Sequence, residues 1–379
     1  MSGRSIARTL GILGGGQLAR MLAVAARPLG IDCIVVEPTG PHCPAAPVAE
    51  VLVGAFDDRG VLEALASRCT VVTVELEAIP VSTIEWLADR LDVRPGAEAV
   101  RVAQDRLLEK QLLRSLGIAT APFDDEVPVG LSSIVKTRRG GYDGRGQIRT
   151  RTAGERAAAV QELPDPIVEG LVAFQRELSI VAARNATGDI VCYPLVENVH
   201  VDGILRQTVA PAIVSDAMRA DAEKIAAMLL HRLDYVGVVG IELFDVNDEL
   251  VVNEFAPRVH NTGHWTIEGS TTSQFEQHVR AVMGLPLGDV TTRGVSTMIN
   301  AIGMLPDLQC VLTIPGCHMH IYDKENRPDR KVGHVTITAD TSKELDQRVR
   351  ALRDLVGESW GGFANTEPLY AAAANSAST

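Results

Sequence analysis

Apolar runs and amphipathic segments alternate in the first part of the chain in a way that predicts a parallel sheet. One apolar strand leads through glycines into a helix, where apolar side chains recur at helical spacing from Leu18 to Ala25 before Pro28 and Gly30 end it. Strand–helix–strand units joined by short loops form parallel sheets. The predicted strands cover 10–13, 32–37 and 71–75.

From about Arg101 the pattern changes to many strands with few helices between them. An amphipathic helix at 105–116 comes first, and a second long helix is predicted near 216–232. This pattern favours a mainly antiparallel α+β region. Its strands centre on Ile134, Ile167, Leu178, Ile190, Leu205, Val238 and Val251.

A third, smaller unit begins after 285–288, and the last residues have no apolar period, so we expect them to form a disordered tail. The overall prediction is a chain of α/β and α+β class. Strands of the third unit are predicted at 295–302, 318–322 and 334–338, with a helix at about 342–355. The predicted domains are 1–100, 101–288 and 289–370, followed by the tail at 371–379.

Composition restricts the possible partners and compartment. The net charge is −12, whereas a broad nucleic-acid-binding surface needs an excess of clustered Lys and Arg. The six cysteines form no C-x-x-C pair, the chain starts without a signal segment, and no run of about 18 apolar residues is present. We expect a soluble cytoplasmic protein with reduced cysteines that binds neither nucleic acid nor membrane.

Glycines 14–16 lie between the first strand and its helix and satisfy the pattern G-x-G-x-x-A, with Glu37 about 20 residues further on. This is the dinucleotide fingerprint in its expected context. Physically it provides a tight turn whose backbone amides face an anion. A phosphate of some other ligand is favoured over a nicotinamide cofactor, and a turn without ligand is the remaining alternative.

Glu242 and Glu254 belong to two apolar segments that read as a hairpin around Asn247, Asp248 and Glu249. If 246 pairs with 250, the two glutamates lie opposite each other on one face. Facing carboxylates repel unless a cation neutralises them, and Mg²⁺ prefers one or two carboxylates with phosphate oxygens. Asn253 then points to the opposite face unless a bulge turns it inward.

Two polar segments follow the hairpin. Arg258, His260 and Asn261 offer a guanidinium fork for a planar anion and groups that orient it or handle a proton. Further on, four basic residues lie within eight positions of an acidic protein, which suits a phosphate monoester, although a solvated turn is the more common explanation of such a run. They are Lys324, Arg327, Arg330 and Lys331.

The stretch GGYDGRGQ at 140–147 is rich in glycine, which favours a loop that moves or approaches a ligand closely. Together with Lys136, the glutamate pair and the 258–261 loop, it resembles the ATP-grasp enzymes. Six ordered strings extend the likeness over nearly the whole chain to the N5-carboxyaminoimidazole ribonucleotide synthetases of purine biosynthesis. They are GILGGGQLARM at 11–21, DRLLEKQLL at 105–113, IVKTRRGGYDGRGQ at 134–147, YPLVENVHVDGILR at 193–206, NEFAPRVHNTGHWT at 253–266 and RPDRKVGH at 327–334.

The resemblance implies a Rossmann-like pre-ATP-grasp domain, a central ATP-grasp domain with a mobile lid at about 118–170, and a small C-terminal domain. It also implies a carbon–nitrogen ligase. ATP and bicarbonate would give carboxyphosphate, whose carboxylate passes to the N5 amine of aminoimidazole ribonucleotide. The implied cofactors are ATP and Mg²⁺, with Mn²⁺ as the alternative ion, and the implied assembly is a homodimer.

The resemblance also assigns roles to individual residues. Those implied to bind ATP are Arg106, Lys136, Gly141, Tyr142, Asp143, Gly144, Arg145, Gly146, Gln147, Glu169, Gly170, Leu171, Val172, Glu177, His200, Asn253 and Glu254. Those implied to bind the ribonucleotide are Gly15, Gly16, Gln17, Glu75, Tyr142, Asp143, Lys324, Arg330 and Lys331. Glu242 and Glu254 would hold the metal, and Arg258, His260 and Asn261 would orient bicarbonate.

Alternatives remain open from the sequence. A formyl-transferring or biotin carboxylase-like ATP-grasp ligase shares the central motifs, and an NAD-dependent dehydrogenase would explain the first 40 residues. A nucleotide sensor without catalysis is a third possibility. Two positions depart from the family pattern: Asp329 stands where glycine is usual, and Val74 where an aromatic residue is common.

Overall fold

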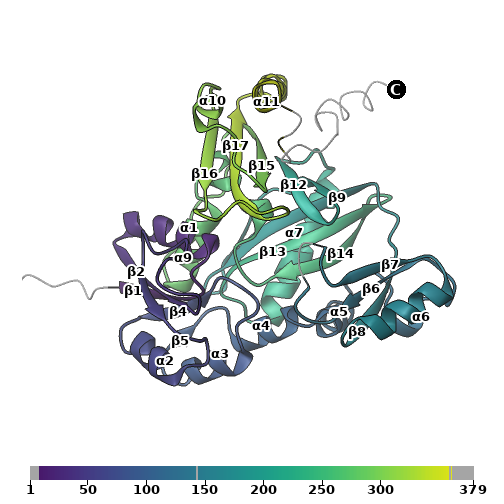
Figure 1. The fold of residues 1–379 in the computed structure, drawn as a ribbon, viewed down its shortest axis with the longest axis horizontal. Coiled ribbons are helices and arrows are strands. Elements are labelled where there is room, and N and C mark those ends of the chain that lie inside the picture. The colour runs from purple at the N-terminus through teal and green to yellow at the C-terminus, as the bar shows by residue number, and fades with distance from the viewer. Residues whose placement is uncertain (1–7, 142–143, 358–359, 361–379) are drawn as a thin grey trace, which may run out of the picture.

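The structure is a computed structural model of the 379-residue chain, and it describes residues 8–141, 144–357 and 360. Tyr142, Asp143 and the predicted tail at 371–379 lie outside the described residues. Three sheets organise the described part of the chain (Figure 1). None of the described helices combines the length and the apolar character needed to cross a membrane.

The first sheet is parallel, as predicted, with the order β3-β2-β1-β4-β5. Its central strands are buried on both faces, which explains their continuous apolar sequence. The strands are β1 (Arg8–Leu13), β2 (Ile31–Glu37), β3 (Glu50–Val53), β4 (Val71–Val74) and β5 (Asp92–Val93). The helices are α1 (Gln17–Ala26), α2 (Arg59–Ala66), α3 (Val81–Ala88) and α4 (Ala97–Ala103).

The second sheet has nine strands and continues from the central region into the third unit. Its order is β14-β13-β9-β11-β12-β15-β17-β16, with β10 paired to β9, and all of these pairs are antiparallel. The central strands are β9 (Arg176–Arg184), β10 (Ile190–Cys192), β11 (Val196–Val201), β12 (Ile204–Ala210), β13 (Gly237–Val246) and β14 (Glu249–Ala256). The C-terminal strands are β15 (Val295–Ile302), β16 (Cys317–Ile321) and β17 (Lys331–Ala339).

A separate three-stranded sheet, in the order β7-β6-β8, forms most of the predicted lid. It lies beside α6 at the side of the molecule away from the first sheet (Figure 1). Its elements are β6 (Ser133–Thr137), β7 (Gln147–Thr150), α6 (Ala153–Glu162) and β8 (Pro166–Gly170). The remaining α-helices are α5 (Arg106–Ser115), α7 (Asp216–Arg232), α8 (Thr266–Gly269), α9 (Gln274–Val282), α10 (Leu308–Leu312) and α11 (Ser342–Val356).

The loop of the β13–β14 hairpin differs from the prediction. Val246 pairs with Glu249, not with 250, so the loop has two residues instead of three. Asn247 and Asp248 both have positive φ, of 54° and 66°, which is the signature of a tight two-residue hairpin turn. A register shift after Glu242 then restores the predicted pairing of that glutamate with Glu254. The predicted facing pair is therefore confirmed, although the register on which it was based was wrong.

Helix α9 joins the parallel sheet to the central sheet. Phe275 and Val279 of α9 share a core cluster with Leu22 of α1. His278 of α9 is fully buried, and its Nε2 lies 2.8 Å from the hydroxyl of Thr73 on β4. Its Nδ1 accepts a hydrogen bond from the Val238 N–H at 3.0 Å. Burial lowers the pKa of His278 to about 4, so the ring is neutral when the domains are assembled.

We predict that acidification weakens this junction. Because the pKa of folded His278 is about 4 and its ordinary value is 6.5, the unfolded chain binds the extra proton. Stability that is complete above pH 6.5 is lost as the pH falls towards 4. Between about pH 7 and about pH 5 this histidine alone should lower the free energy of unfolding by about 2 kcal/mol.

Urea unfolding at the two pH values checks this. His278→Asn keeps an acceptor for the Val238 N–H but does not titrate. Between the two pH values its free energy of unfolding should therefore fall by about 2 kcal/mol less than that of the wild type. The same pH dependence in both proteins would contradict the assignment.

Candidate functional site

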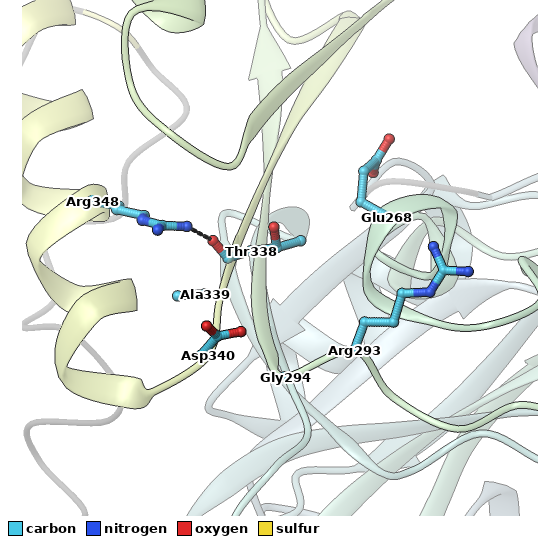
Figure 2. Close-up of a pocket in the computed structure, with 7 residues that line it drawn as sticks. All are labelled: Glu268, Arg293, Gly294, Thr338, Ala339, Asp340 and Arg348. Atoms are coloured by element: carbon cyan, nitrogen blue, oxygen red, sulfur yellow. Dashed lines mark hydrogen bonds between the residues drawn. The ribbon is translucent and has the colours of Figure 1, made fainter.

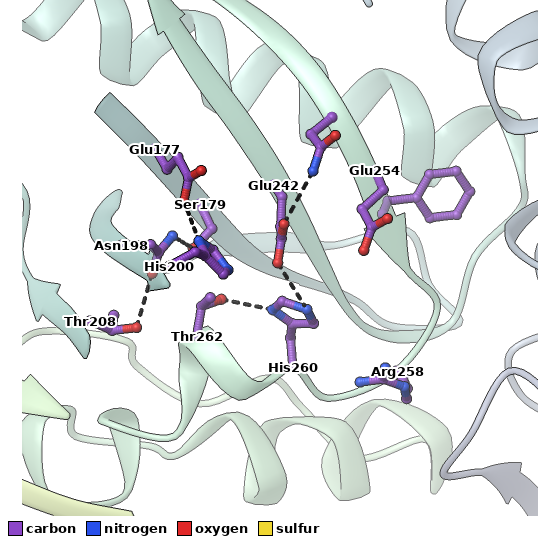
Figure 3. A network of polar contacts seen from close by, with 12 residues as sticks. Glu177, Ser179, Asn198, His200, Thr208, Glu242, Glu254, Arg258, His260 and Thr262 are labelled. Atoms are coloured by element: carbon purple, nitrogen blue, oxygen red, sulfur yellow. Dashed lines mark hydrogen bonds and ion pairs between the residues drawn. The ribbon is translucent and has the colours of Figure 1, made fainter. Parts of the chain in front are cut away.

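The β13–β14 hairpin carries the predicted metal ligands. Glu242 and Glu254 are paired across the strands, and the register shift makes Asn253 the extra residue of a bulge (Figure 3). Asn253 Nδ2 lies 3.4 Å from Glu242 Oε2, so its side chain points to the face of the glutamates. This is the exception that the sequence left open. Three oxygen-bearing side chains thus converge on one face.

The two carboxylates differ electrostatically. Burial raises the pKa of Glu254, but Arg106, whose Nη1 lies 2.9 Å from Glu254 Oε2, and Lys136 outweigh burial and bring the pKa to about 2. Burial also raises the pKa of Glu242 against the charge of His200, and repulsion by Glu254 adds to the rise. Glu254 is therefore held in its charged form, whereas the surroundings of Glu242 favour its neutral form.

These donors fit a hard divalent ion that is shared with a bound phosphate. Mg²⁺ prefers oxygen ligands and typically takes one or two carboxylates together with substrate phosphates. Within the described ranges, no three His, Cys, Asp or Glu side chains are grouped to hold a metal ion.

Beside this pair, strands β9 and β11 bring Glu177 and His200 into contact, and a hydrogen bond joins Glu177 Oε2 to His200 Nδ1 (Figure 3). Burial lowers the pKa of His200, but Glu177 and the charge of Glu242 outweigh burial and raise it. Asn198 on the same strand donates to Ser179 Oγ at 2.9 Å. Asn198 and Ser179 were not among the predicted residues, and they hold β11 and β9 in register below the site.

The predicted bicarbonate loop lies against the hairpin. His260 Nε2 is 3.6 Å from Glu242 Oε1, and His260 Nδ1 is 2.8 Å from Thr262 Oγ1. Burial and the charge of Arg258 lower the pKa of His260 to about 3, so this histidine is neutral. Both amide atoms of Asn261 are buried and have no hydrogen-bond partner among the described residues. The loop therefore presents a neutral imidazole and an amide beside a fixed guanidinium.

Two residues outside the predicted set position this loop. Glu77 Oε1 lies 2.7 Å from Arg258 Nη2, so a residue near the first sheet fixes the orientation of the Arg258 guanidinium. Gln274 of α9 accepts from the His260 N–H at 2.9 Å and donates to the His260 carbonyl at 2.7 Å. Neither residue belongs to a local motif, and only long-range contacts identify them.

The glycine loop lies against the turn between β11 and β12. A Cβ atom added to Gly144, whose φ is 77°, would stand 2.7 Å from the carbonyl oxygen of Asp202. A Cβ atom added to Gly203 would stand 2.8 Å from Gly144 Cα. Arg106 Nη2 donates to the Gly141 carbonyl at 3.2 Å. The two backbones meet at a distance that only glycines permit, and the loop thereby closes the end of the site.

The segment that leaves the lid also carries predicted residues. Lys136 Nζ on β6 lies 2.9 Å from Glu169 Oε2 on β8. Gly170 ends β8, Leu171 and Val172 begin the connection to β9, and Leu171 is exposed. Because this connection passes from the lid to the main sheet, it is placed to form one side of a nucleotide site.

The glycine turn before α1 is occupied by the chain's own carboxylates. Gly15 N–H donates to Glu37 Oε2 at 2.9 Å, and Gly16 N–H donates to Glu75 Oε1 at 2.6 Å. Ala19 N–H donates to Glu75 Oε2 at 2.8 Å. In a dinucleotide site these amides would face a pyrophosphate and the acidic residue would bind a ribose. This arrangement argues against the NAD alternative, and it leaves contact of Gly15 and Gly16 with substrate as a prediction.

The basic cluster extends from the third unit to the residue that follows the glycine turn. Lys324 Nζ is hydrogen-bonded to Gln17 Oε1 at the start of α1. Lys331 begins β17, and its charge contributes to lowering the pKa of His260. Asp329 is exposed and has a φ of 60°, a left-handed backbone conformation that favours glycine. Lys324 of the cluster therefore contacts the first domain, and binding of a substrate phosphate by the cluster stays a prediction.

A further cavity of about 360 Å³ lies away from these residues (Figure 2). It is formed between α8, the start of β15 and the β17–α11 connection. None of the predicted site residues lines it, so it is not part of the candidate site. Its lining residues are Glu268, Arg293, Gly294, Thr338, Ala339, Asp340 and Arg348.

The sequence matches three domain families in chain order. Residues 7–104 match the ribonucleotide synthetase preATP-grasp domain, 119–275 the ATP-grasp domain, and 296–348 the phosphoribosylaminoimidazole carboxylase C-terminal domain. The predicted three-domain architecture is confirmed, while its stated boundaries stay a prediction.

Relatives similar over nearly their whole length include N5-carboxyaminoimidazole ribonucleotide synthases. An N5-carboxyaminoimidazole ribonucleotide synthase of Pseudomonas aeruginosa is 41% identical over 359 residues, which cover 92% of this chain and 99% of the relative. The crystal structure of an N5-carboxyaminoimidazole ribonucleotide synthetase from Thermus thermophilus is 46% identical, with a TM-score of 0.86 over 92% of this chain and 99% of that chain. One from Aspergillus clavatus, in complex with ADP and 5-aminoimidazole ribonucleotide, is 32% identical, with a TM-score of 0.84 over 92% and 98%. The chain belongs to the N5-carboxyaminoimidazole ribonucleotide synthase family of ATP-grasp enzymes.

Proposed function

We propose that this chain catalyses the reaction for which its relatives are named. It is a carbon–nitrogen ligase of de novo purine (IMP) synthesis. ATP and bicarbonate form carboxyphosphate and ADP; the N5 amine of 5-aminoimidazole ribonucleotide then attacks the carboxyl carbon and releases phosphate, giving N5-carboxyaminoimidazole ribonucleotide. The observation that carries the proposal is the pairing of Glu242 with Glu254 between Arg106 and His260, which combines metal ligands with groups that bind an oxyanion.

ATP would bind between the lid and the central sheet. Arg106, Lys136 and the 140–147 loop would hold its phosphates, the 169–172 connection its adenine, and Glu177 its ribose. Glu242 and Glu254, with Asn253 beside them, would hold Mg²⁺, or Mn²⁺ in its place. When bound, the ion neutralises charge on the β- and γ-phosphates. His200, held by its hydrogen bond to Glu177, would contact the same nucleotide.

Bicarbonate would bind at Arg258, His260 and Asn261. The guanidinium gives a planar two-donor contact, and Glu77 prevents it from rotating away. A neutral His260 orients bicarbonate without adding a charge that would compete with the phosphate for it. The two unpaired amide atoms of Asn261 offer one donor and one acceptor to the same ligand. Positioning of this kind is what phosphoryl transfer needs most.

Aminoimidazole ribonucleotide would bind across the first and third domains. Its phosphate would lie between Gln17 and the cluster of Lys324, Arg330 and Lys331. Glu75 lies at the start of α1, where it holds Gly16 and Ala19. Tyr142 and Asp143, which would contact the imidazole, lie outside the described residues.

We also propose a cytoplasmic location and a homodimer. All six cysteines are free, which suits a reducing compartment. The dimer is proposed on the family resemblance alone.

The first test is substrate dependence. Purified protein with ATP and Mg²⁺ should release ADP at its full rate only when both bicarbonate and aminoimidazole ribonucleotide are present, and the product should be carboxylated and labile to acid. A coupled ADP assay and trapping with labelled bicarbonate measure both results. Release of ADP at the same rate with and without the ribonucleotide would rule out the assignment.

Replacement of Glu254 tests the metal site. Glu254→Gln removes the charged carboxylate and should lower kcat by at least roughly 100-fold while the fold is retained. The matched control is Glu249→Gln at the exposed start of the same strand, which should turn over like the wild type. Normal activity of Glu254→Gln would remove this residue from the site.

Replacement of Lys331 tests the phosphate site. Lys331→Ala should raise KM for the ribonucleotide roughly tenfold or more, because a charge-assisted contact is lost, while KM for ATP changes little. Arg327→Ala is the control, since Arg327 is exposed and pairs with Glu325. If both variants behave alike in steady-state kinetics, the cluster is a solvated turn.

A further inference from the structure

Two lysines share one carboxylate oxygen below the lid. Lys136 Nζ lies 2.9 Å from Glu169 Oε2, and Lys110 Nζ lies 3.3 Å from the same oxygen. The exposed fractions of the three side chains are 1% for Lys110, 4% for Glu169 and 10% for Lys136. The other carboxylate oxygen of Glu169 has no hydrogen-bond partner among the described residues. Charge compensation of this buried glutamate therefore comes mainly from the two lysines, and the charge of Arg106 adds a smaller contribution.

The first of these lysines is fixed in place. Lys110 comes from α5, and its ammonium also donates to Thr120 Oγ1 at 3.2 Å. Thr120 in turn donates to the Val252 carbonyl on β14 at 3.0 Å. Burial lowers the pKa of Lys110, and the charge of Glu169 opposes that effect. Thr120, which is hydrogen-bonded to the main sheet, thus holds the Lys110 ammonium at Glu169.

The second lysine is placed differently. Lys136 belongs to the lid strand β6, and its ammonium contacts Glu169 while its charge also helps to lower the pKa of Glu254 on the β13–β14 hairpin. In the proposed function this ammonium binds ATP phosphates. A phosphate would therefore draw Lys136 from Glu169, and a buried carboxylate left without a counter-charge is strongly unfavourable.

We propose that Lys110 is a positioning residue for ATP binding: it keeps Glu169 neutralised, so that Lys136 can leave that carboxylate for the nucleotide phosphates. This inference rests on the proposed function of Lys136. Without Lys110, Lys136 is the one ion-paired partner that the described residues leave to Glu169. The pair then competes with ATP for the one ammonium that both need.

Removal of Lys110 should weaken nucleotide binding and leave the chemistry intact. In Lys110→Met, KM for ATP and Kd for ADP should both rise at least about tenfold, with kcat within about threefold of the wild type, because the lost interaction acts in the ground state. Arg114→Met is the matched control, since it removes an exposed cation of the same helix that pairs with Glu126. It should bind ADP like the wild type.

A double variant separates this role from a merely structural one. In a Glu169→Gln background the competing carboxylate is gone, so adding Lys110→Met should change Kd for ADP less than about threefold in calorimetry, measured against Glu169→Gln alone. If Lys110→Met alone does not fold, this comparison carries the test, because the double variant removes opposite charges together. A Lys110→Met effect of roughly tenfold or more in the Glu169→Gln background, or unchanged ADP binding in Lys110→Met alone, overturns the proposal.

The readout distinguishes this proposal from the proposed function. ADP calorimetry needs neither bicarbonate nor ribonucleotide. Wild-type protein that binds ADP but shows no turnover dependent on the ribonucleotide would refute the carboxylation and leave the role of Lys110 measurable.

Discussion

Repulsion between Glu242 and Glu254 is the constraint around which the site is arranged. The hairpin forces the two carboxylates onto one face, and folding is compatible with this only because Arg106 holds one of them and Asn253 donates to the other. The same repulsion would favour the proposed divalent ion, since the cost of bringing the charges together is met when the chain folds. Arg106 comes from α5, so the arrangement of the two carboxylates on the hairpin depends on a helix that is far away in the sequence.

Pattern alone predicted elements that are long and regular. The helix at 216–232 was predicted with its exact bounds because its polar start and its length are unambiguous, and Ser215 caps it. Strand β5 has only two residues and was missed, because so short a segment shows no period. The hairpin loop was predicted one residue too long. Asn247 and Asp248 both adopt the left-handed backbone conformation of a two-residue turn, and the pattern of apolar and polar residues does not reveal backbone conformation.

Site residues within local strings were predictable, whereas those that act from elsewhere were not. Arg258 and His260 lie in one short loop, so their proximity is guaranteed by the chain. Glu77, Gln274 and Lys110 support that loop and the lid across many positions, and none has a motif of its own. The glycine turn shows the reverse case: its motif is clear, yet Glu75 already occupies its amides, a fact that only the assembled fold reveals.

Pairing of β12 with β15 makes the main sheet continuous from the metal hairpin to the strand that begins with Lys331. The two ends of the proposed reaction are thus connected by backbone hydrogen bonds that form once, when the chain folds. Their alignment costs no orientational entropy at each turnover of the proposed reaction. Proximity of the two proposed substrate sites is thus a property of the folded backbone itself.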